Sequence, residues 1–186
     1  MSTFVVARLG YSGSVTTERP PARTHWLDDE EMRAWRGLVE AYADLQAALE
    51  ADLVTGFGID GGDYGVLVNL SEAPEQRLRM CDLAARLHLS PSGLTRRLDG
   101  LVKAGYVARQ ASEQDRRVTL AVLTDSGRAT LEAAAPVHVA GVRTNFVDHL
   151  SRTQLRQLGA AFEALQRRRG LDSPGQESRP ETLETA

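Results

Sequence analysis

The sequence predicts a mostly α-helical protein with one small β-hairpin. Apolar residues recur at helical spacing over most of residues 28–165. Only two short stretches, Tyr106–Ala111 and Arg117–Leu123, resemble paired strands. A short helix, a tight turn and a basic helix precede this hairpin. That order predicts a winged helix-turn-helix. The remaining long helices are expected to form a helical dimerisation region.

Composition places the chain among ordinary globular proteins. Of its 186 residues, 42% are apolar and 25% are charged. No apolar run approaches the ~20 residues that a membrane span requires, and the N-terminus lacks the order of a signal peptide. We therefore expect a cytoplasmic protein without a membrane partner. The single cysteine, Cys81, excludes an intramolecular disulfide.

Charge is distributed unevenly along the chain. The net charge is -3, yet residues 79–117 contain eight basic and four acidic residues. That segment carries +4, so the remainder carries -7. A protein polarised in this way can present its basic face to phosphates.

The first predicted helix begins near Asp28 and runs for about 25 residues. Asp28 and Glu31 have the spacing of a capping box, and glycines from Gly56 onward end the helix. A helix this long with an apolar stripe usually packs against a partner. The stripe comprises Met32, Trp35, Val39, Tyr42, Leu49 and Leu53. A second helix is expected over residues 60–73, with Tyr64, Leu67, Val68 and Leu70 buried.

The third helix is expected over residues 80–87, with Met80, Leu83, Ala84 and Leu87 facing inward. His88 would take a left-handed conformation in the following turn. Ser90 has the character of an N-cap and Pro91 suits the first helical position. The fourth helix would bury Leu94, Leu98, Leu101 and Val102, and Gly105 would end it.

Two further helices follow the hairpin, in which Val118, Leu120 and Val122 alternate with other residues. Thr124 would cap a helix that carries Leu131, Ala135, His138, Val142 and Phe146, and Pro136 should kink it. Ser151 and Gln154 form a capping box for the last helix. Its narrow apolar seam is suited to helix packing and comprises Leu155, Leu158, Phe162 and Leu165.

The exposed face of the fourth helix predicts contact with duplex DNA. Ser92, Thr95 and Arg96 could reach base edges in the major groove. Ser90 and the free N–H groups at this N-terminus could bind a phosphate. Arg97 and Lys103 would contact the DNA backbone.

The hairpin tip carries Asp115, Arg116 and Arg117. The two arginines would lie near the narrow minor groove, where the negative potential is enhanced. Asp115 repels phosphate, so we interpret it as the ion-pair partner of an arginine. The alternative for the helix is a solvated basic face, and for the hairpin a weak surface salt bridge. The turn, the cap and the hairpin together favour DNA.

Other classes of function find less support. The sequence contains no nucleophile elbow, phosphate loop or metal motif, so we predict no enzyme activity, cofactor or metal. His138 and His149 share a helix face but would lie ~16 Å apart, too far to share one ion. A winged helix that binds protein is a further alternative. Its fourth helix should expose apolar anchors, whereas this one exposes Arg96, Arg97 and Lys103.

From about Asp28 to Leu165 the chain resembles the MarR family of bacterial transcriptional regulators. The matching fragments are Leu83–Leu87, Ser90–Ser92, Leu98–Val102, Gly105–Val107, Asp115–Arg117 and Leu123–Arg128. The resemblance implies a homodimeric repressor whose first and last helices pair. Two lobes would then bind a palindromic operator, with Asp115 orienting Arg117 toward the minor groove. His88 departs from the glycine common in the family.

The resemblance also implies the domain layout and a mode of control. A disordered extension (1–25), a dimerisation helix (26–60), a DNA-binding lobe (61–123), dimerisation helices (124–169) and a disordered tail (170–186) would follow one another. A small aromatic or phenolic ligand could bind between the lobe and the dimer base and release DNA. The residues that could line this cleft, unless they are simply core, are Trp35, Tyr42, Tyr64, Leu67 and His138. Redox control through Cys81 is the alternative.

Overall fold

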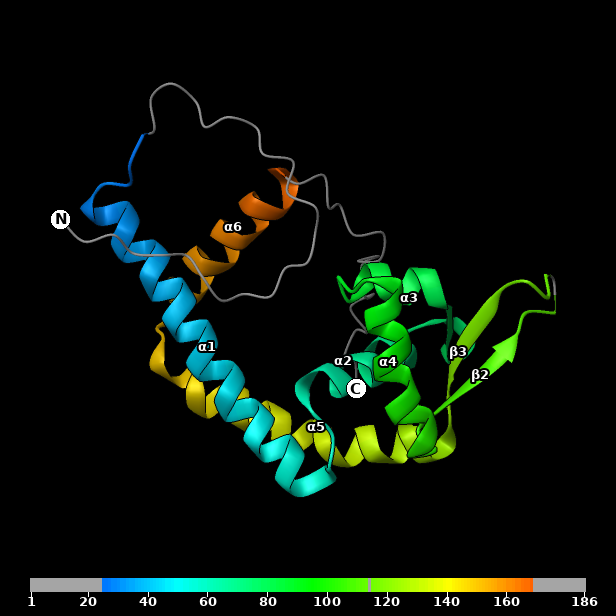
Figure 1. Ribbon diagram of the computed structural model, residues 1–186. Helices are drawn as coiled ribbons and strands as arrows, with labels where there is room; N and C mark the ends of the chain where they lie inside the picture. Colours follow the sequence, from blue (N-terminus) through cyan, green and yellow to red (C-terminus); the bar gives the residue numbers. More distant parts are fainter. Residues whose placement is uncertain (1–24, 114, 169–186) are drawn as a thin grey trace, which may run out of the picture. The chain divides into compact units, whose positions relative to one another are not determined.

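The computed structural model describes residues 25–113 and 115–168 (Figure 1). The expected disordered ends, apart from His25, lie outside these residues. The described fold is mostly helical with a small antiparallel sheet, as predicted. Its elements are α1 (Asp29–Phe57), α2 (Gly61–Ser71), a 3-10 turn η1 (Pro74–Gln76), β1 (Arg77–Arg79), α3 (Met80–Arg86), α4 (Pro91–Lys103), β2 (Val107–Ala111), β3 (Thr119–Leu123), α5 (Asp125–Asn145), a 3-10 turn η2 (Val147–His149) and α6 (Arg152–Arg168).

The chain divides after Val39 into two compact units, which are described separately. In the first unit, the Asp28 carboxylate accepts hydrogen bonds from the backbone N–H groups of Glu30 and Glu31, each at 2.9 Å. The Glu31 carboxylate accepts from the Asp28 N–H at 2.9 Å, which confirms the predicted capping box.

Within the described residues, no helix is both long and apolar enough to cross a membrane.

The helix-turn-helix in the second unit forms as the local sequence predicts. His88 has a φ of 53°, which confirms the left-handed turn. The Ser90 hydroxyl oxygen accepts a hydrogen bond from the Gly93 N–H at 3.1 Å, and Pro91 opens α4. Gly105 has a φ of 77° just beyond the helix end. These local devices fix where α4 starts and stops.

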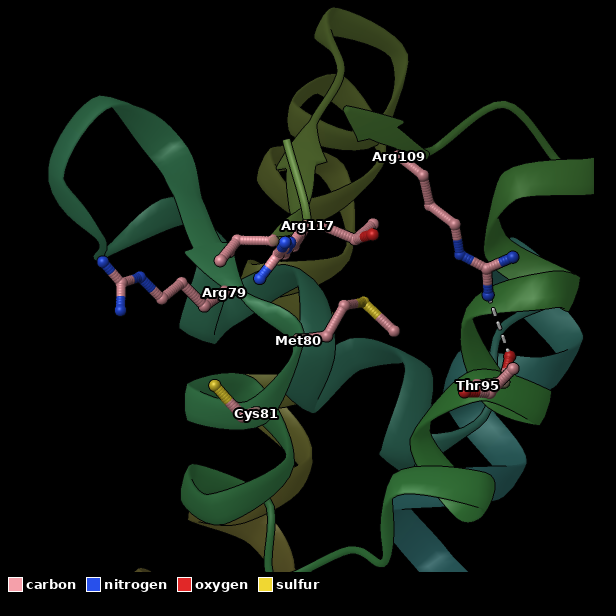
Figure 2. Close-up of a pocket in the computed structure, with 8 residues that line it drawn as sticks. Arg79, Met80, Cys81, Thr95, Arg109 and Arg117 are labelled. Atoms are coloured by element: carbon pink, nitrogen blue, oxygen red, sulfur yellow. Dashed lines mark hydrogen bonds between the residues drawn. The ribbon is translucent and has the colours of Figure 1, made fainter. Parts of the chain in front are cut away.

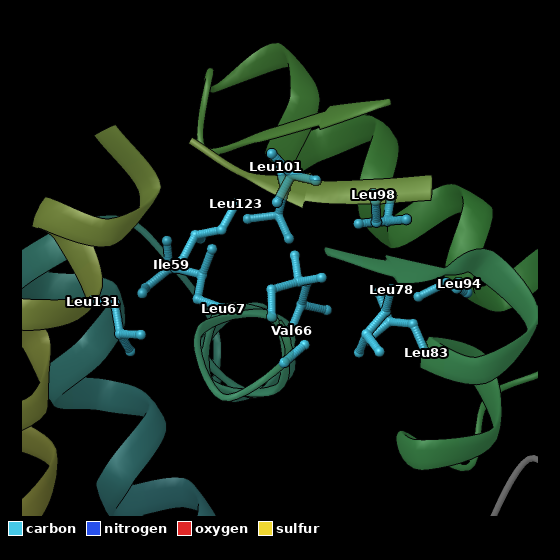
Figure 3. Packing of buried hydrophobic residues seen from close by; sticks show 14 of the residues in the cluster. Ile59, Val66, Leu67, Leu78, Leu83, Leu94, Leu98, Leu101, Leu123 and Leu131 are labelled. Atoms are coloured by element: carbon cyan, nitrogen blue, oxygen red, sulfur yellow. The ribbon is translucent and has the colours of Figure 1, made fainter. Parts of the chain in front are cut away.

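The core of the second unit lies between α2, α3, α4 and the sheet (Figure 3). Leu94, Leu98 and Leu101 of α4 are buried there, as predicted. Val102 is 37% exposed, so the prediction that it is buried is wrong. It lies one residue beyond Leu101 and therefore turns away from the i, i+4, i+7 stripe. In α2, Val66 is fully buried, whereas Tyr64 and Val68 are only partly buried.

The sheet has three strands in the order β1-β3-β2. Strand β1 was not predicted, because three residues with charges at both ends carry no recognisable pattern. It pairs with β3, placing Arg77 opposite Val122 and Arg79 opposite Leu120. On β3 the buried side chains are Ala121 and Leu123, the opposite set from the alternating residues noted in the sequence.

Caps and close contacts also define the helices that follow the sheet. The Thr124 hydroxyl donates to the Gly105 carbonyl at 2.7 Å and accepts from the Gly127 N–H at 3.0 Å. Pro136 lies within α5, which remains one helix. Ser151 and Gln154 form the predicted capping box of α6. Phe162 and Leu165 of its apolar seam are exposed.

Candidate nucleic-acid interface

The outer face of α4 presents polar and basic side chains. Ser90, Ser92, Thr95, Arg96 and Lys103 are all exposed. The Thr95 hydroxyl donates to the Pro91 carbonyl at 2.9 Å, which leaves its oxygen free to accept from a ligand. Neither Arg96 nor Lys103 forms an ion pair with a residue that the structure describes. Their charges are therefore available to a partner.

The hairpin tip between β2 and β3 exposes Asp115, Arg116 and Arg117. The sequence predicted an ion pair between Asp115 and an arginine side chain. Instead, the Asp115 carboxylate accepts a hydrogen bond from the backbone N–H of Arg117 at 2.9 Å. The correction follows from chain geometry, since a carboxylate two residues upstream reaches the backbone N–H in an Asx-type turn. Asp115 thus shapes the backbone from which the Arg117 side chain extends.

A pocket of about 500 Å³ lies between α3, α4 and the β2–β3 hairpin, residues 107–123, which we call the wing. Arg79, Arg109 and Arg117 reach it from the strand side, and Thr95 from α4 (Figure 2). The Arg109 guanidinium donates to the Asp99 carboxylate at 2.7 Å and to the Thr95 carbonyl at 3.1 Å. Among the described residues, Arg79 and Arg117 have no ion-pair partner. The pocket is therefore electropositive.

Arg97 does not lie on the outer face with Arg96. It is half-buried, and one terminal nitrogen contacts the carboxylates of Asp60 and Asp63 at the start of α2. The contact of Arg97 with the DNA backbone stays a prediction, and the structure shows that its guanidinium is paired within the lobe. Arg97 stands three residues after Leu94 and four before Leu101, so it lies at the edge of the buried stripe and turns toward α2.

Sequence reasoning missed the roles of Arg79 and Arg109. Both belong to the basic segment, residues 79–117, but the sequence predicted neither their position nor their contacts. Arg79 ends β1, a strand too short to predict, and pairing with β3 places it beside the wing. Arg109 lies in a predicted strand, and its distance of ten residues from Asp99 gave no sign of their contact.

Of the residues expected to bind an effector, the structure brings Tyr64 and His138 together. Their ring centroids are 4.5 Å apart, and burial raises the pKa of Tyr64 and lowers the pKa of His138. The buried Nδ1 of His138 has no partner among the described residues. Leu67 is fully buried in the core of the lobe. Tyr42 is exposed, and Trp35 belongs to the other unit.

Cys81 is exposed at the beginning of α3 and lines the electropositive pocket. Its thiol lies 3.4 Å from the Asp82 carboxylate, to which it donates. Redox control through this residue stays a prediction.

Comparisons with known proteins agree with this architecture. The model of the MarR family matches residues 57–118. The transcriptional repressor YetL of Bacillus subtilis is 33% identical over 113 residues, which cover 59% of this chain and 68% of YetL. The structure of AbsC, a MarR family transcriptional regulator from Streptomyces coelicolor, matches with a TM-score of 0.74 and 41% identity over 79% of this chain and 99% of AbsC.

A second regulator from Streptomyces coelicolor, Sco3205, was solved in complex with DNA. It matches with a TM-score of 0.75 and 35% identity, covering 82% of this chain and 94% of its own. The chain is 33–41% identical to these three relatives and covers 68–99% of each, so it belongs to the MarR family of transcriptional regulators.

Proposed function

We propose that this chain is a homodimeric repressor that acts in the cytoplasm and binds a palindromic operator. The observation that carries the proposal is a set of exposed cations on α4 and the wing that have no ion-pair partner in the described lobe. These are Arg96, Lys103, Arg116 and Arg117, with Arg79 beside them. Cations left free in this way can replace the counterions of DNA phosphates.

The two grooves would be contacted by different elements. Helix α4 would enter the major groove, with Ser92, Thr95 and Arg96 at base edges. Arg is the commonest reader of guanine, so Arg96 is the residue most suited to specify a base. Ser90 and Lys103 would bind phosphates, and the wing would place Arg116 and Arg117 at the minor groove. The complex of Sco3205 with DNA supports DNA as the partner.

Exposed apolar side chains on α1 and α6 support a homodimer. Trp35 and Val39 are 57% and 45% exposed, and Leu165 on α6 is 56% exposed. Apolar surface of this extent on long helices suits pairing between copies. A two-fold pair of lobes would read an inverted repeat whose half-sites lie one helical turn apart, about 10–10.5 base pairs.

Repression would follow from binding of the protein to the operator, and its relief from release of the DNA. The name of YetL as a repressor supports this sign of regulation. We propose that a small aromatic or phenolic compound relieves repression by binding beside Tyr64 and His138. The unpartnered Nδ1 of His138 supplies a hydrogen-bonding group, and the Tyr64 ring supplies a stacking face. We propose no enzymatic activity for this chain.

A winged helix that docks on another protein is the competing function. Its contact helix should expose apolar anchors, whereas the outer face of α4 exposes Arg96, Thr95 and Lys103. The same charges are expected from a DNA-binding helix, so the exposed chemistry favours DNA.

Selection from a library of random duplexes tests the proposal. Purified full-length chain should enrich a short inverted repeat, and light scattering should give the mass of two chains. Arg96→Ala should relax the preference at one base position in each half-site, because that side chain would read one base pair. The matched control is Arg152→Ala on α6, which should select the same sequence as the parent. Enrichment of no sequence, or a strictly monomeric chain, would refute the proposal.

A further inference from the structure

Arg97 of α4 is joined to the beginning of α2 by two carboxylates. Its Nη1 atom donates to Asp60 and, at 2.9 Å, to Asp63. The Asp60 carboxylate also accepts the backbone N–H of Asp63 at 2.7 Å, as the N-cap of α2. One carboxylate therefore caps α2 and binds α4 at the same time.

Gly62 makes room for this contact. A Cβ at residue 62 would lie 2.6 Å from both terminal nitrogens of Arg97, so the guanidinium, the end of a flexible side chain, would have to shift away. The neighbouring Gly61 has no atom within 4 Å of such a Cβ. The guanidinium thus lies against the bare backbone of the first turn of α2, between the two carboxylates.

Electrostatics and burial favour a fixed position for this side chain. Burial disfavours the charged form of Arg97, but the hydrogen bonds and charges of Asp60 and Asp63 outweigh it and raise the pKa of Arg97. The Arg97 and Asp63 side chains are only 27% and 24% exposed. Removal of Arg97 would leave the partly buried Asp63 carboxylate without its cation, which a protein disfavours.

We infer that Arg97 is a positioning residue for DNA recognition, which sets the angle of α4 against α2 and so aims Arg96 at its base. The inference rests on the proposed function. Arg96 and Arg97 are neighbours on one helix, and their side chains leave it about 100° apart, so Arg96 is exposed while Arg97 turns toward α2. A rotation or tilt of α4 that follows loss of the Arg97 contact would move Arg96 by the same angle. Arg97 itself would neutralise no phosphate.

Salt dependence separates a positioning role from a phosphate contact. The slope of log affinity against log salt should fall by about 0.9 for each phosphate-binding cation that is removed. Arg97→Gln should leave this slope unchanged on a random-sequence duplex. Its preference for the selected inverted repeat over the random duplex should fall by about tenfold for each half-site, the loss expected for one spoiled base contact in each.

Gly62→Ala tests the same claim without removing any charge. The added methyl group should displace the guanidinium, although alanine favours the helix itself. It should lower sequence preference as Arg97→Gln does, whereas the matched control Gly61→Ala should behave as the parent. Amide hydrogen exchange of α4 without DNA should rise in Gly62→Ala and Arg97→Gln, and not in Gly61→Ala.

Two results would overturn the inference. A smaller salt slope for Arg97→Gln would show that Arg97 binds phosphate. Unchanged sequence preference in both Arg97→Gln and Gly62→Ala would show that the Arg97 contact does not position Arg96. If the parent chain itself has no sequence preference, the proposed function fails and takes the DNA role of Arg97 with it. The exchange measurement would then still decide whether the contact holds α4 in place.

Discussion

Arg109 on wing strand β2 donates a hydrogen bond of 2.7 Å to the carboxylate of Asp99 on α4. A second hydrogen bond, at 3.1 Å, reaches the Thr95 carbonyl of the same helix. One guanidinium therefore joins the wing to two successive turns of the helix. On the surface that we assign to DNA, Arg109 and Asp99 therefore neutralise each other.

Asp99→Asn should tighten binding to a random-sequence duplex. The substitution removes a negative charge from the interface and frees Arg109 for phosphate. Because Asp99 is 60% exposed, the free energy of unfolding should change by less than about 1 kcal/mol. Fluorescence anisotropy at several salt concentrations measures the affinity. Asp44→Asn on α1 changes the net charge equally and should have the smaller effect; equal effects would contradict a local role.

Arg117→Ala should weaken DNA binding and leave the fold and dimer intact. The side chain is exposed at the wing tip and has no ion pair among the described residues. Loss of its contact should lower the salt slope by about 0.9 for each copy in the complex. Affinity for the selected duplex and the thermal midpoint are the measurements. If the variant binds that duplex as well as the parent does, the role of the wing is wrong.

Local signals in the sequence predicted the helices and the turn of the DNA-binding lobe. Asp28, Ser90 and Thr124 act within three residues of themselves, so their roles as caps can be predicted without knowledge of the fold. The direction of Arg97 could not be predicted in this way. It depends on Asp60 and Asp63, more than thirty residues upstream, and on where α2 packs.

The sheet and the hairpin tip contain the other differences. Strand β1 exists because β3 offers it an edge, which no three-residue pattern reveals. Asp115 was expected to pair with an arginine side chain, whereas its partner is a backbone N–H. Contacts made through the backbone are invisible in residue types alone, so charge pairing was the more obvious prediction.

His88→Gly and Gly105→Ala should change stability in opposite directions. Both positions have positive φ, 53° and 77°, which glycine adopts without the steric cost of a Cβ. His88→Gly should raise the free energy of unfolding by up to about 1 kcal/mol, since glycine also carries an entropic cost. Gly105→Ala should lower it by about 1–2 kcal/mol through backbone strain alone, because no atom lies near its added Cβ. Urea unfolding measures both; equal signs would contradict this account.

His138 should make the protein less stable in mild acid. Burial lowers its folded pKa below the ordinary value of 6.5, so the unfolded chain binds a proton first as the pH falls. The contribution to stability is therefore complete above about pH 6.5 and is lost as the pH falls through that value toward the folded pKa. The free energy of unfolding of the parent minus that of His138→Gln, measured by urea unfolding from about pH 5 to 8, should rise with pH. A difference that is flat or falls with pH would show that the imidazole is not held neutral.

The account rests on two copies of one basic lobe binding adjacent turns of a duplex. Hydroxyl-radical footprinting on the selected inverted repeat, with the stoichiometry measured in the same samples, tests this most directly. We predict two chains per duplex and two protected segments whose centres lie about 10–10.5 base pairs apart. One chain bound to one protected segment would contradict it.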